Sequence, residues 1–587
     1  MSSDSPTPES SAPSSGPSAL ELEKQQLREL NQKPLVPRYL GYVKLSGPGW
    51  LQSALTLGGG SLASGLYLGV LTGYSLLWLQ PLAMILGIIM LAALSYLTLS
   101  TGERTFRAIN YHVSPVLGWG WLIGSMMANM VWALPQYSLA VAAIKQNLLP
   151  SVFGEEAMSG TTSNLILVPI ILAVATVITW SYGSGHWGVR LYERMLKVVV
   201  ALIVLCFVLV VGRIVVTDPA FTVGDLFAGF IPSPSSLTEP PEAYQSILAE
   251  IEEPSRTFWY DYIMSQQVDV AMAAFATAVG INMTFLLAYS MLGRNWGREH
   301  RTLSIFDLST GMFIPFLLAT TCVVVSAGNR FHSQPYYNLL ETVDGTLADG
   351  ESPAPQKAID EFNGLLKQRV KKDILNEETD TAAWSEKEWE GQIDARMATD
   401  TISDAEKRLA STLVKRDSFD LSRALEPLFQ GKLFADIIFG LGVLGMAMST
   451  ISLLMLVAGF CVCEALNVPS TGWPFRLGTL AAATGALGPF FWGQAAPYLA
   501  IPTSVFGIVL LPIAYASFFF LMNSKSYMKD ELPKGNKKVV WNVLMLCATT
   551  TSIVASCYAV WTKTGYVGIV GMLLFIAAAL VTRRKHA

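Results

Sequence analysis

Two short segments hold the residues whose types and spacing could do chemistry in this chain. One is Gly58, Gly59, Gly60 and Ser61, and the other contains Gly280, Asn282, Met283 and Thr284. Each glycine destabilises a helix by about 1 kcal/mol relative to alanine. Three consecutive glycines in an apolar stretch therefore predict a broken helix whose backbone lines a cavity. Two alternatives stay open: the glycines could serve close helix packing, and Asn282 could bond a neighbouring helix.

The polar groups at these positions favour one class of ligand over another. Hydroxyl, amide and thioether groups are weak ligands for a hard divalent cation, which usually takes carboxylate oxygens. The free N–H groups and the positive dipole end at the start of a half-helix instead favour an anion or the carboxylate of a zwitterion. The two segments therefore predict a substrate site without metal ligands.

Other reactive side chains form no recognisable catalytic pattern. The five histidines lie in loops, at span ends or in the tail, and no nucleophile–base pair or metal-ligand spacing links them. The six cysteines all fall in apolar stretches, which argues against a disulfide scaffold. We therefore expect no enzyme, no catalytic residue and no resident cofactor.

The composition indicates a multi-span membrane protein. The chain has 587 residues, of which 52% are hydrophobic and only 14% charged, whereas an ordinary soluble protein carries about 25% charged residues. Apolar runs long enough to span a bilayer repeat from Gly47 onward. The net charge of -4 supplies no basic field for nucleic acid. The lipid bilayer and a small-molecule or ion substrate are the expected partners.

The apolar runs predict an all-α membrane protein with about twelve transmembrane helices. We expect them at residues 47–73, 75–101, 116–144, 164–182, 191–216, 269–292, 304–327, 433–463, 474–492, 501–523, 539–561 and 565–582. Lys and Arg gather in alternate loops, such as 104–107, 294–301 and 525–538. Because cytoplasmic loops are enriched in these residues, we expect both termini to be cytoplasmic, in a plasma or inner membrane.

Four regions follow from these boundaries. Residues 1–43 form a cytoplasmic tail, which is largely disordered because its start is rich in Ser and Pro, and residues 44–328 hold transmembrane helices 1–7. Residues 329–431 form an external helical module, and residues 432–587 hold helices 8–12 with a short cytoplasmic C-terminus. The polar composition of the module fits either a solvated cap or a unit that binds an unidentified partner.

The two glycine-containing segments fall in spans one and six. These spans occupy corresponding positions if spans one to five and six to ten are repeats. Interrupted helices at corresponding positions of two halves point to the binding site of a secondary transporter. The pairing therefore predicts a five-plus-five inverted repeat in which helices one and six are discontinuous.

The order of several motifs resembles the natural-resistance-associated macrophage protein (Nramp) family of metal-ion transporters. Gly47-Pro48-Gly49-Trp50, leading to Gly58, is similar to that family's first helix. Further similar segments are Thr101–Arg104, Ile305–Asp307, Gly328–His332, Gly445–Thr450 and Leu511–Ala514. The resemblance covers residues 47–527 apart from the long loops. It implies the LeuT-type fold and the transport of a metal ion.

The chain departs from the family at the positions that the family uses for chemistry. The family's metal-binding Asp-Pro-Gly-Asn falls on Gly58 to Ser61, and its sixth-helix Met falls on Asn282. Its histidine positions fall on Thr284 and Tyr289, and its acids associated with proton movement on Ser125, Trp132 and Pro135. The resemblance thus implies a substituted metal site without the usual proton carriers. We expect aromatic residues to wall or gate the enlarged cavity: Trp132, Tyr137, Phe285 and Tyr289.

Three interpretations of function follow from the sequence. The first is an Nramp-like secondary transporter of a small anionic, zwitterionic or neutral solute, without proton coupling through the family's usual residues. The second is a divalent metal-ion transporter that takes a hydrated cation such as Mg²⁺ or Mn²⁺, as the family resemblance implies. The third is a transport-inactive membrane sensor or receptor.

Overall fold

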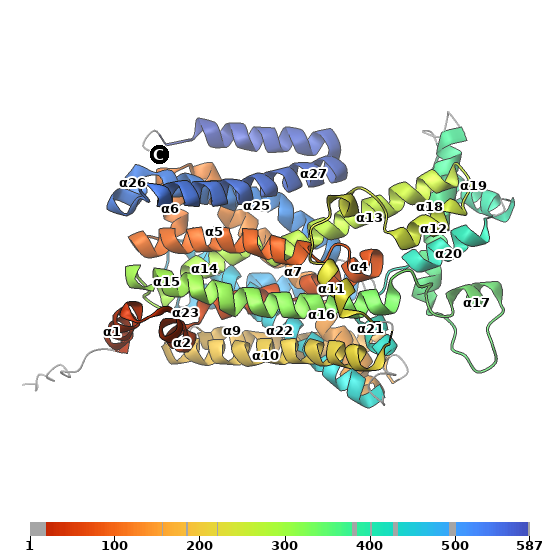
Figure 1. Ribbon diagram of the computed structural model, residues 1–587, viewed down its shortest axis with the longest axis horizontal. Coiled ribbons are helices and arrows are strands. Elements are labelled where there is room, and N and C mark those ends of the chain that lie inside the picture. Colours follow the sequence, from red (N-terminus) through yellow and green to blue (C-terminus); the bar gives the residue numbers. More distant parts are fainter. Residues whose placement is uncertain are drawn as a thin grey trace, which may run out of the picture.

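The computed structural model describes residues 19–154, 157–182, 186–219, 221–377, 384–399, 402–425, 432–491 and 500–584. Within these residues every regular element is a helix (Figure 1). The disordered start predicted at residues 1–17 lies outside the described residues, as do residues 426–431 at the end of the predicted module. Two helices, α1 (Ala19–Gln32) and α2 (Leu35–Leu45), occupy the rest of the predicted tail.

Nine helical segments of the described chain are long and apolar enough to cross a bilayer. They are α5 (Leu79–Thr101), α7 (Pro115–Ala143, extended by a π-helical turn), α9 (Gly160–Tyr182), α10 (His186–Thr217), α13 (Ser255–Ala278) with α14 (Ile281–Gly293), α15 (Arg301–Asp307) with α16 (Phe313–Phe331), α22 (Lys432–Ala465), α25 (Ala500–Asn523) and α27 (Asn536–Val581). The pair α3 (Pro48–Thr56) and α4 (Gly59–Thr72) passes the same test together and is bent by 53°.

The last helix supplies two of the twelve predicted spans. At 1.5 Å per residue, the 46 residues of α27 extend over about 70 Å, whereas the hydrocarbon core of a bilayer is about 30 Å thick. Gly565 divides α27 because its φ of 58° and ψ of -141° are not helical. The two arms fold back on each other (Figure 1), and Cys557 Sγ lies 4.0 Å from Met572 Sδ.

The segment predicted as the span 474–492 differs from the expectation. The described part contains α23 (Gly472–Thr479), a 3-10 helix (Leu480–Leu487) and α24 (Gly488–Phe491) in place of one long helix. Two of its glycines, Gly485 and Gly488, lie against α7: a Cβ added at Gly485 would be 2.4 Å from the Cβ of Ala133. This close approach explains why the segment is rich in small residues without being a regular span.

The sixth span begins earlier than predicted, at Ser255 instead of residue 269. The added turns carry the fully buried Trp259, whose indole N–H donates to Glu406 Oε1 at 3.2 Å. Asp269 therefore lies within α13, where it pairs with Lys563 at 2.6 Å. Hydropathy does not predict these turns because they contain polar residues. The side chains that bond to them come from a distant part of the chain.

The segment after α16 forms its own helices. They are α17 (Leu339–Asp344), α18 (Gln356–Glu377), α19 (Glu386–Thr399), α20 (Asp404–Leu413) and α21 (Ser418–Leu425). Helices α17 to α20 lie beyond the ends of the long helices, with α12 (Glu242–Ala249) beside them (Figure 1). We call α17 to α21 the module.

Burial separates central from peripheral helices. Over their most apolar windows, α13–α14 and α22 are 83% and 89% buried, whereas α27 is 0% buried. The helices that contain or touch the predicted site are therefore the ones at the centre of the bundle.

Candidate functional site

The first span is interrupted where the glycine run predicts a break. Helix α3 ends at Thr56 and α4 starts at Gly59, so that only Leu57 and Gly58 lie between them. Gly58 is extended, with φ -110° and ψ -176°. The break is thus shorter than the glycine run, because Gly59 and Gly60 already belong to the first turn of α4.

The sixth span is interrupted as well. Val279 (φ -143°, ψ 111°) and Gly280 (φ -87°, ψ 161°) are extended between α13 and α14. A Cβ added at Gly280 would lie 2.3 Å from Cη2 of Trp132. Glycine is required here by the close approach of this indole rather than by the backbone angles.

The two breaks contact each other directly. The hydroxyl of Thr56, the last residue of α3, donates to Ala278 O at 3.3 Å and lies 3.5 Å from Met283 Sδ. The same sulfur accepts the N–H of Gly280 at 3.2 Å. The thioether of Met283 therefore joins the end of α3 to the start of α14.

A cavity of about 40 Å³ lies between the breaks. It is lined by residues of α3, α4, α7, α13, α14, α22 and α25: Leu55, Thr56, Gly58, Gly60, Ser61, Trp132, Pro135, Gln136, Thr277, Gly280, Met283, Thr450, Thr503 and Ser504. We call it the central cavity. Its volume suits one or two water molecules or a small ion.

The cavity contains half of the residues that the sequence predicted for the site. Gly58, Gly60, Ser61, Gly280, Met283 and Trp132 line it, whereas Gly59, Asn282, Thr284, Tyr137, Phe285 and Tyr289 do not. Asn282 instead donates to Asn129 Oδ1 at 2.9 Å, and Thr284 accepts from the indole of Trp121 at 2.8 Å. Phe285 stacks on Tyr289 with ring centroids 4.5 Å apart, and Tyr137 is fully buried.

Eight lining residues were not among the predicted site residues: Leu55, Thr56, Pro135, Gln136, Thr277, Thr450, Thr503 and Ser504. Gln136 has the clearest role, because its Oε1 accepts the N–H of Gly59 at 2.9 Å. Thr450 lies so close to the first break that a Cβ at Gly58 would be 2.4 Å from its hydroxyl oxygen. The available signal was polar side chains inside apolar spans, which usually face the protein interior.

The electrostatics of the central cavity come from helix ends. The first N–H groups of α4 and α14 have no intrahelical partner, and both helices begin with a partial positive charge. The last carbonyls of α3 are met by hydroxyls: Ser449 Oγ donates to Ala54 O at 3.3 Å, and Ser61 donates to Thr56 O. Among the lining residues there is no carboxylate and no imidazole. Across the described residues, no three His, Cys, Asp or Glu side chains are grouped to hold a metal ion.

A second polar site lies at the start of α3. The fully buried Asp307 accepts the N–H groups of Gly47 and Gly49 through Oδ2, at 3.1 and 2.6 Å. Glu193 pairs with Arg294 at 2.9 Å, and Lys197 donates to Ser46 O at 2.6 Å. We call Glu193, Lys197, Arg294 and Asp307 the charged cluster. Of its two acids, Glu193 is paired with Arg294, and Asp307 is bonded to the backbone.

Comparison with known proteins identifies the family. The sequence signature described as "Natural resistance-associated macrophage protein-like" matches residues 49–348 and 405–562, which is well over half of the chain. A curated relative, "Metal transporter Nramp7.1" of Populus trichocarpa, is 27% identical over 228 residues. That match covers 34% of this chain and 36% of the relative, so the chain spans about a third of the relative's length.

Solved structures agree on the fold. The manganese transporter of Eremococcus coleocola, crystallised with an aromatic bis-isothiourea substituted compound, has a TM-score of 0.59 and 14% sequence identity, and 94% of each chain is covered. Two mutants of that transporter give TM-scores of 0.57 and 0.58 at the same identity and coverage. At this identity the likeness concerns the fold alone.

Proposed function

The chain belongs to the Nramp family of membrane transporters, and we propose that it is a secondary transporter whose substrate passes through the central cavity. It is an integral multi-pass membrane protein with an Nramp-like helical fold. Support for the route comes from the two breaks, since discontinuous helices in corresponding spans mark the binding sites of such transporters. Both breaks contribute lining residues, among them Gly58 and Gly280.

The substrate that we propose is a small anionic, zwitterionic or neutral solute. The single observation that carries this proposal is the absence of a carboxylate among the described residues that line the central cavity. The start of α4 is capped by the neutral amide of Gln136, so no counter-charge offsets its positive end. Such a site favours a ligand that brings its own negative or polar group.

Proton coupling through the family's usual positions does not fit these residues. Ser125, Trp132 and Pro135 stand where the resemblance implies acids, and their side chains do not titrate near neutral pH. Transport that moves protons would therefore need a carrier elsewhere in the chain.

A divalent metal ion is the second candidate substrate, and one observation favours it. The Met283 thioether lines the central cavity, and thioethers bind soft metal ions. The curated relative is itself named a metal transporter. Without a carboxylate such an ion would keep most of its water. The cavity of about 40 Å³ would have to widen to admit a hydrated cation, as it would to admit glycine, acetate or phosphate.

We also propose that both termini are cytoplasmic and that the module is external. Basic segments that are distant in sequence meet at one end of the bundle: Arg28 pairs with Glu299 at 3.2 Å, and Arg301 pairs with Glu531 at 2.6 Å. At the C-terminal end, Thr582 bonds Ser114 at 2.8 Å. Positive charge of this kind is typical of the cytoplasmic face.

Uptake into liposomes that contain the full-length protein tests the proposal. The panel is radiolabelled glycine, acetate, phosphate and Mn²⁺. We expect saturable uptake of one of the first three, loss of this uptake in Gly280→Ala, and normal uptake in Gly212→Ala, where an added Cβ meets no atom within 4 Å. Saturable Mn²⁺ uptake alone would favour the second candidate. Ligand binding without any uptake would indicate a sensor or receptor.

A further inference from the structure

A second and much larger cavity lies outside the proposed transport route. This outer cleft has a volume of about 1040 Å³ and separates the bundle from the module. Ser138, Lys145 and Thr161 line it on the bundle side, and Tyr336, Asp417 and Arg423 are among its lining residues on the other side. Its volume is at the upper end of the range for small-molecule sites. It faces the side of α7 opposite to Pro135 and Gln136, so it is not a continuation of the central cavity.

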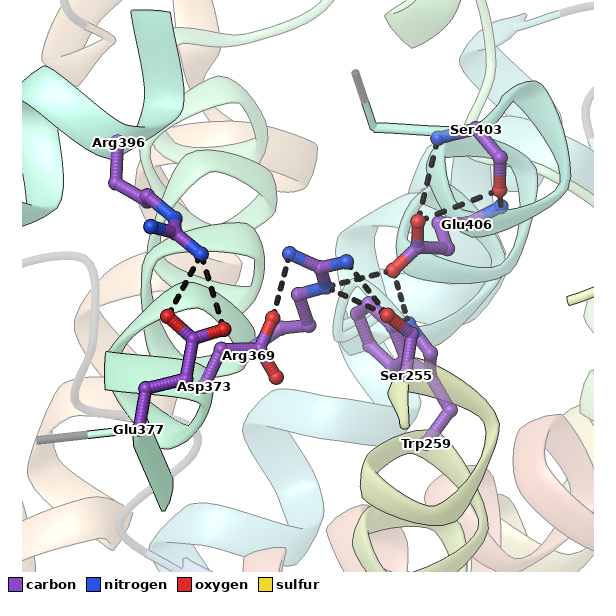
Figure 2. A network of polar contacts seen from close by, with 8 residues as sticks. All are labelled: Ser255, Trp259, Arg369, Asp373, Glu377, Arg396, Ser403 and Glu406. Carbon is purple, nitrogen blue, oxygen red and sulfur yellow. Dashed lines mark hydrogen bonds and ion pairs between the residues drawn. The ribbon is translucent and has the colours of Figure 1, made fainter. Parts of the chain in front are cut away.

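The module is held firmly against the bundle by a buried ion-pair network (Figure 2). Arg369 of α18 donates through Nε to Glu406 Oε1 at 2.8 Å and to Ser255 Oγ at 3.1 Å, and pairs through Nη1 with Asp373 at 2.9 Å. Trp259 donates to the same Glu406 oxygen. Arg369 and Glu406 are 9% and 3% exposed. Breaking such a buried pair costs much free energy. The network therefore holds α18 and α20 against the first turns of α13, and the cleft is a permanent feature of the fold.

The acidic residues of the outer cleft form ion pairs or hydrogen bonds with other residues of the module. Lys357 pairs with Asp417 at 3.2 Å, and Lys415 lies 3.9 Å from Glu361. Asp420 accepts the hydroxyl of Tyr336 at 2.7 Å and the N–H of Asp417 at 2.9 Å. Burial, with the nearby Asp417 carboxylate, raises the pKa of Asp420 to about 6. At neutral pH Asp420 still carries a charge for most of the time, so the described lining holds three acids, Glu361, Asp417 and Asp420, against four cations, Lys145, Lys357, Lys415 and Arg423.

Two other cations that line the outer cleft have no acidic partner among the described residues. Lys145 lies at the end of α7, and Arg423 is on α21 in the module; neither forms an ion pair within the part of the chain that the structure describes. They come from the two facing walls. Clefts lined by an excess of one charge concentrate ions of the opposite sign. Val141 and Phe490 add apolar surface to the same lining.

We propose that the outer cleft binds the phosphate group of an anionic ligand between Lys145 and Arg423, with the organic part of the ligand against the apolar lining. A phosphate can accept hydrogen bonds from both cations at once, and arginine matches its geometry. Two sources supply this chemistry: a soluble phosphate monoester, or the headgroup of an anionic phospholipid, since the cleft adjoins the ends of membrane-spanning helices. The site is independent of the transported solute.

Thermal unfolding of the full-length protein tests the site with both sources. The soluble probe is glycerol 3-phosphate in detergent, against sodium chloride at matched ionic strength. The lipid probe is a nanodisc of phosphatidylcholine with or without phosphatidylglycerol. A ligand that binds the folded protein raises its unfolding temperature. The variant Lys145→Gln/Arg423→Gln is compared with Lys372→Gln/Lys387→Gln, which removes two exposed module charges outside the cleft.

We expect a probe that binds to raise the unfolding temperature of the wild type and of the control variant by about 1–2 °C. In Lys145→Gln/Arg423→Gln the dissociation constant should increase about tenfold, because hydrogen bonds to charged groups contribute on this order. A response to the soluble probe identifies a soluble ligand, and a response to phosphatidylglycerol alone identifies a lipid headgroup. No response to either probe, or an equal response in the cleft variant, overturns the proposal.

A second measurement is independent of ligand affinity. A cysteine introduced by Thr161→Cys lies on the cleft wall, and its reaction with anionic and cationic methanethiosulfonate reagents reports the local potential. We expect the ratio of anionic to cationic rates to fall about fivefold when Lys145 and Arg423 are neutralised, from unit charges acting over several ångströms in water. An unchanged ratio would show that these cations do not control the cleft.

Discussion

Two helix starts in this protein are capped in opposite ways. At the start of α3, the N–H groups of Gly47 and Gly49 are accepted by the buried carboxylate of Asp307. At the start of α4, the N–H of Gly59 is accepted by the neutral amide of Gln136. Both sites are buried, and both contain glycines that allow a close approach.

The difference shows that the chain can bury a carboxylate and does so away from the proposed substrate site. In the charged cluster, Lys197 and Arg294 lie near enough to offset the acids Glu193 and Asp307. None of the described residues that line the central cavity carries a charged side chain. The positive end of α4 is thereby left for a ligand to neutralise, which is why the account favours an anionic or polar solute.

The largest expected effect concerns the charged cluster. Asp307→Ala removes the acceptor of the two buried N–H groups of Gly47 and Gly49. We expect a loss of about 2–6 kcal/mol in unfolding free energy, because each buried donor left without a partner costs about 1–3 kcal/mol. Thermal or denaturant unfolding in detergent measures it. The exposed Asp530→Ala, at the same end of the bundle, is the control and should change stability little; equal losses in both variants would remove the structural role given to Asp307.

The next effect concerns the second break. Gly280→Ala forces a methyl group against Trp132, whose indole donates to Thr503 O at 2.7 Å. Overpacking of this kind costs about 1–3 kcal/mol, and we expect uptake to be lost with it. The double variant Gly280→Ala/Trp132→Leu should regain stability, because the smaller side chain makes room. A stable Gly280→Ala protein with normal uptake would contradict the close approach.

Removal of the neutral cap should cost less than removal of the charged one. Gln136→Leu leaves the N–H of Gly59 without its acceptor, and the loss of a cap costs about 0.5–2 kcal/mol. Comparing Gln136→Leu with Asp307→Ala in one unfolding experiment tests the contrast between the two helix starts. If Gln136→Leu destabilised the protein more, the charged cluster would not be the stronger cap.

The smallest effect concerns the sulfur in the central cavity. Met283→Leu keeps the volume and removes the acceptor that joins Thr56 and Gly280. Volume-conserving core substitutions usually cost less than about 1.5 kcal/mol. We expect uptake of the organic solute or anion to persist at a reduced rate. Complete loss of uptake in a stable Met283→Leu protein would indicate that the sulfur binds the substrate.

The two helix breaks could be predicted from the sequence, but the side chains around them that face the cavity could not. The run Gly58–Gly60 and the glycine at position 280 both predicted interrupted helices, and both interruptions are present. Adjacent helical residues point about 100° apart. The side chain that faces the cavity, Met283 rather than Asn282, depends on the rotation of α14, which the amide contact between Asn282 and Asn129 helps to set.

Long-range contacts also account for the boundaries that differ from the prediction. The early start of α13 depends on Glu406 and Arg369, more than a hundred residues away in the chain. The 3-10 helix Leu480–Leu487 and α24 pack on α7 through Gly485 and Gly488, whereas α23 packs on α22 through Gly478. Hydropathy alone carries no information on such partners, whereas the break at Gly565 was visible in the sequence as the end of an apolar run.

Calorimetric titration of Mn²⁺ into the purified full-length protein tests the central claim most directly. The wild type is compared with Gln136→Glu, which keeps the acceptor for Gly59 and adds the missing carboxylate. We expect the wild type to bind Mn²⁺ no more tightly than millimolar, and Gln136→Glu to bind it at least about tenfold more tightly, or 1.4 kcal/mol. Micromolar binding by the wild type that is lost in Met283→Leu would contradict the account and identify the central cavity as a metal site.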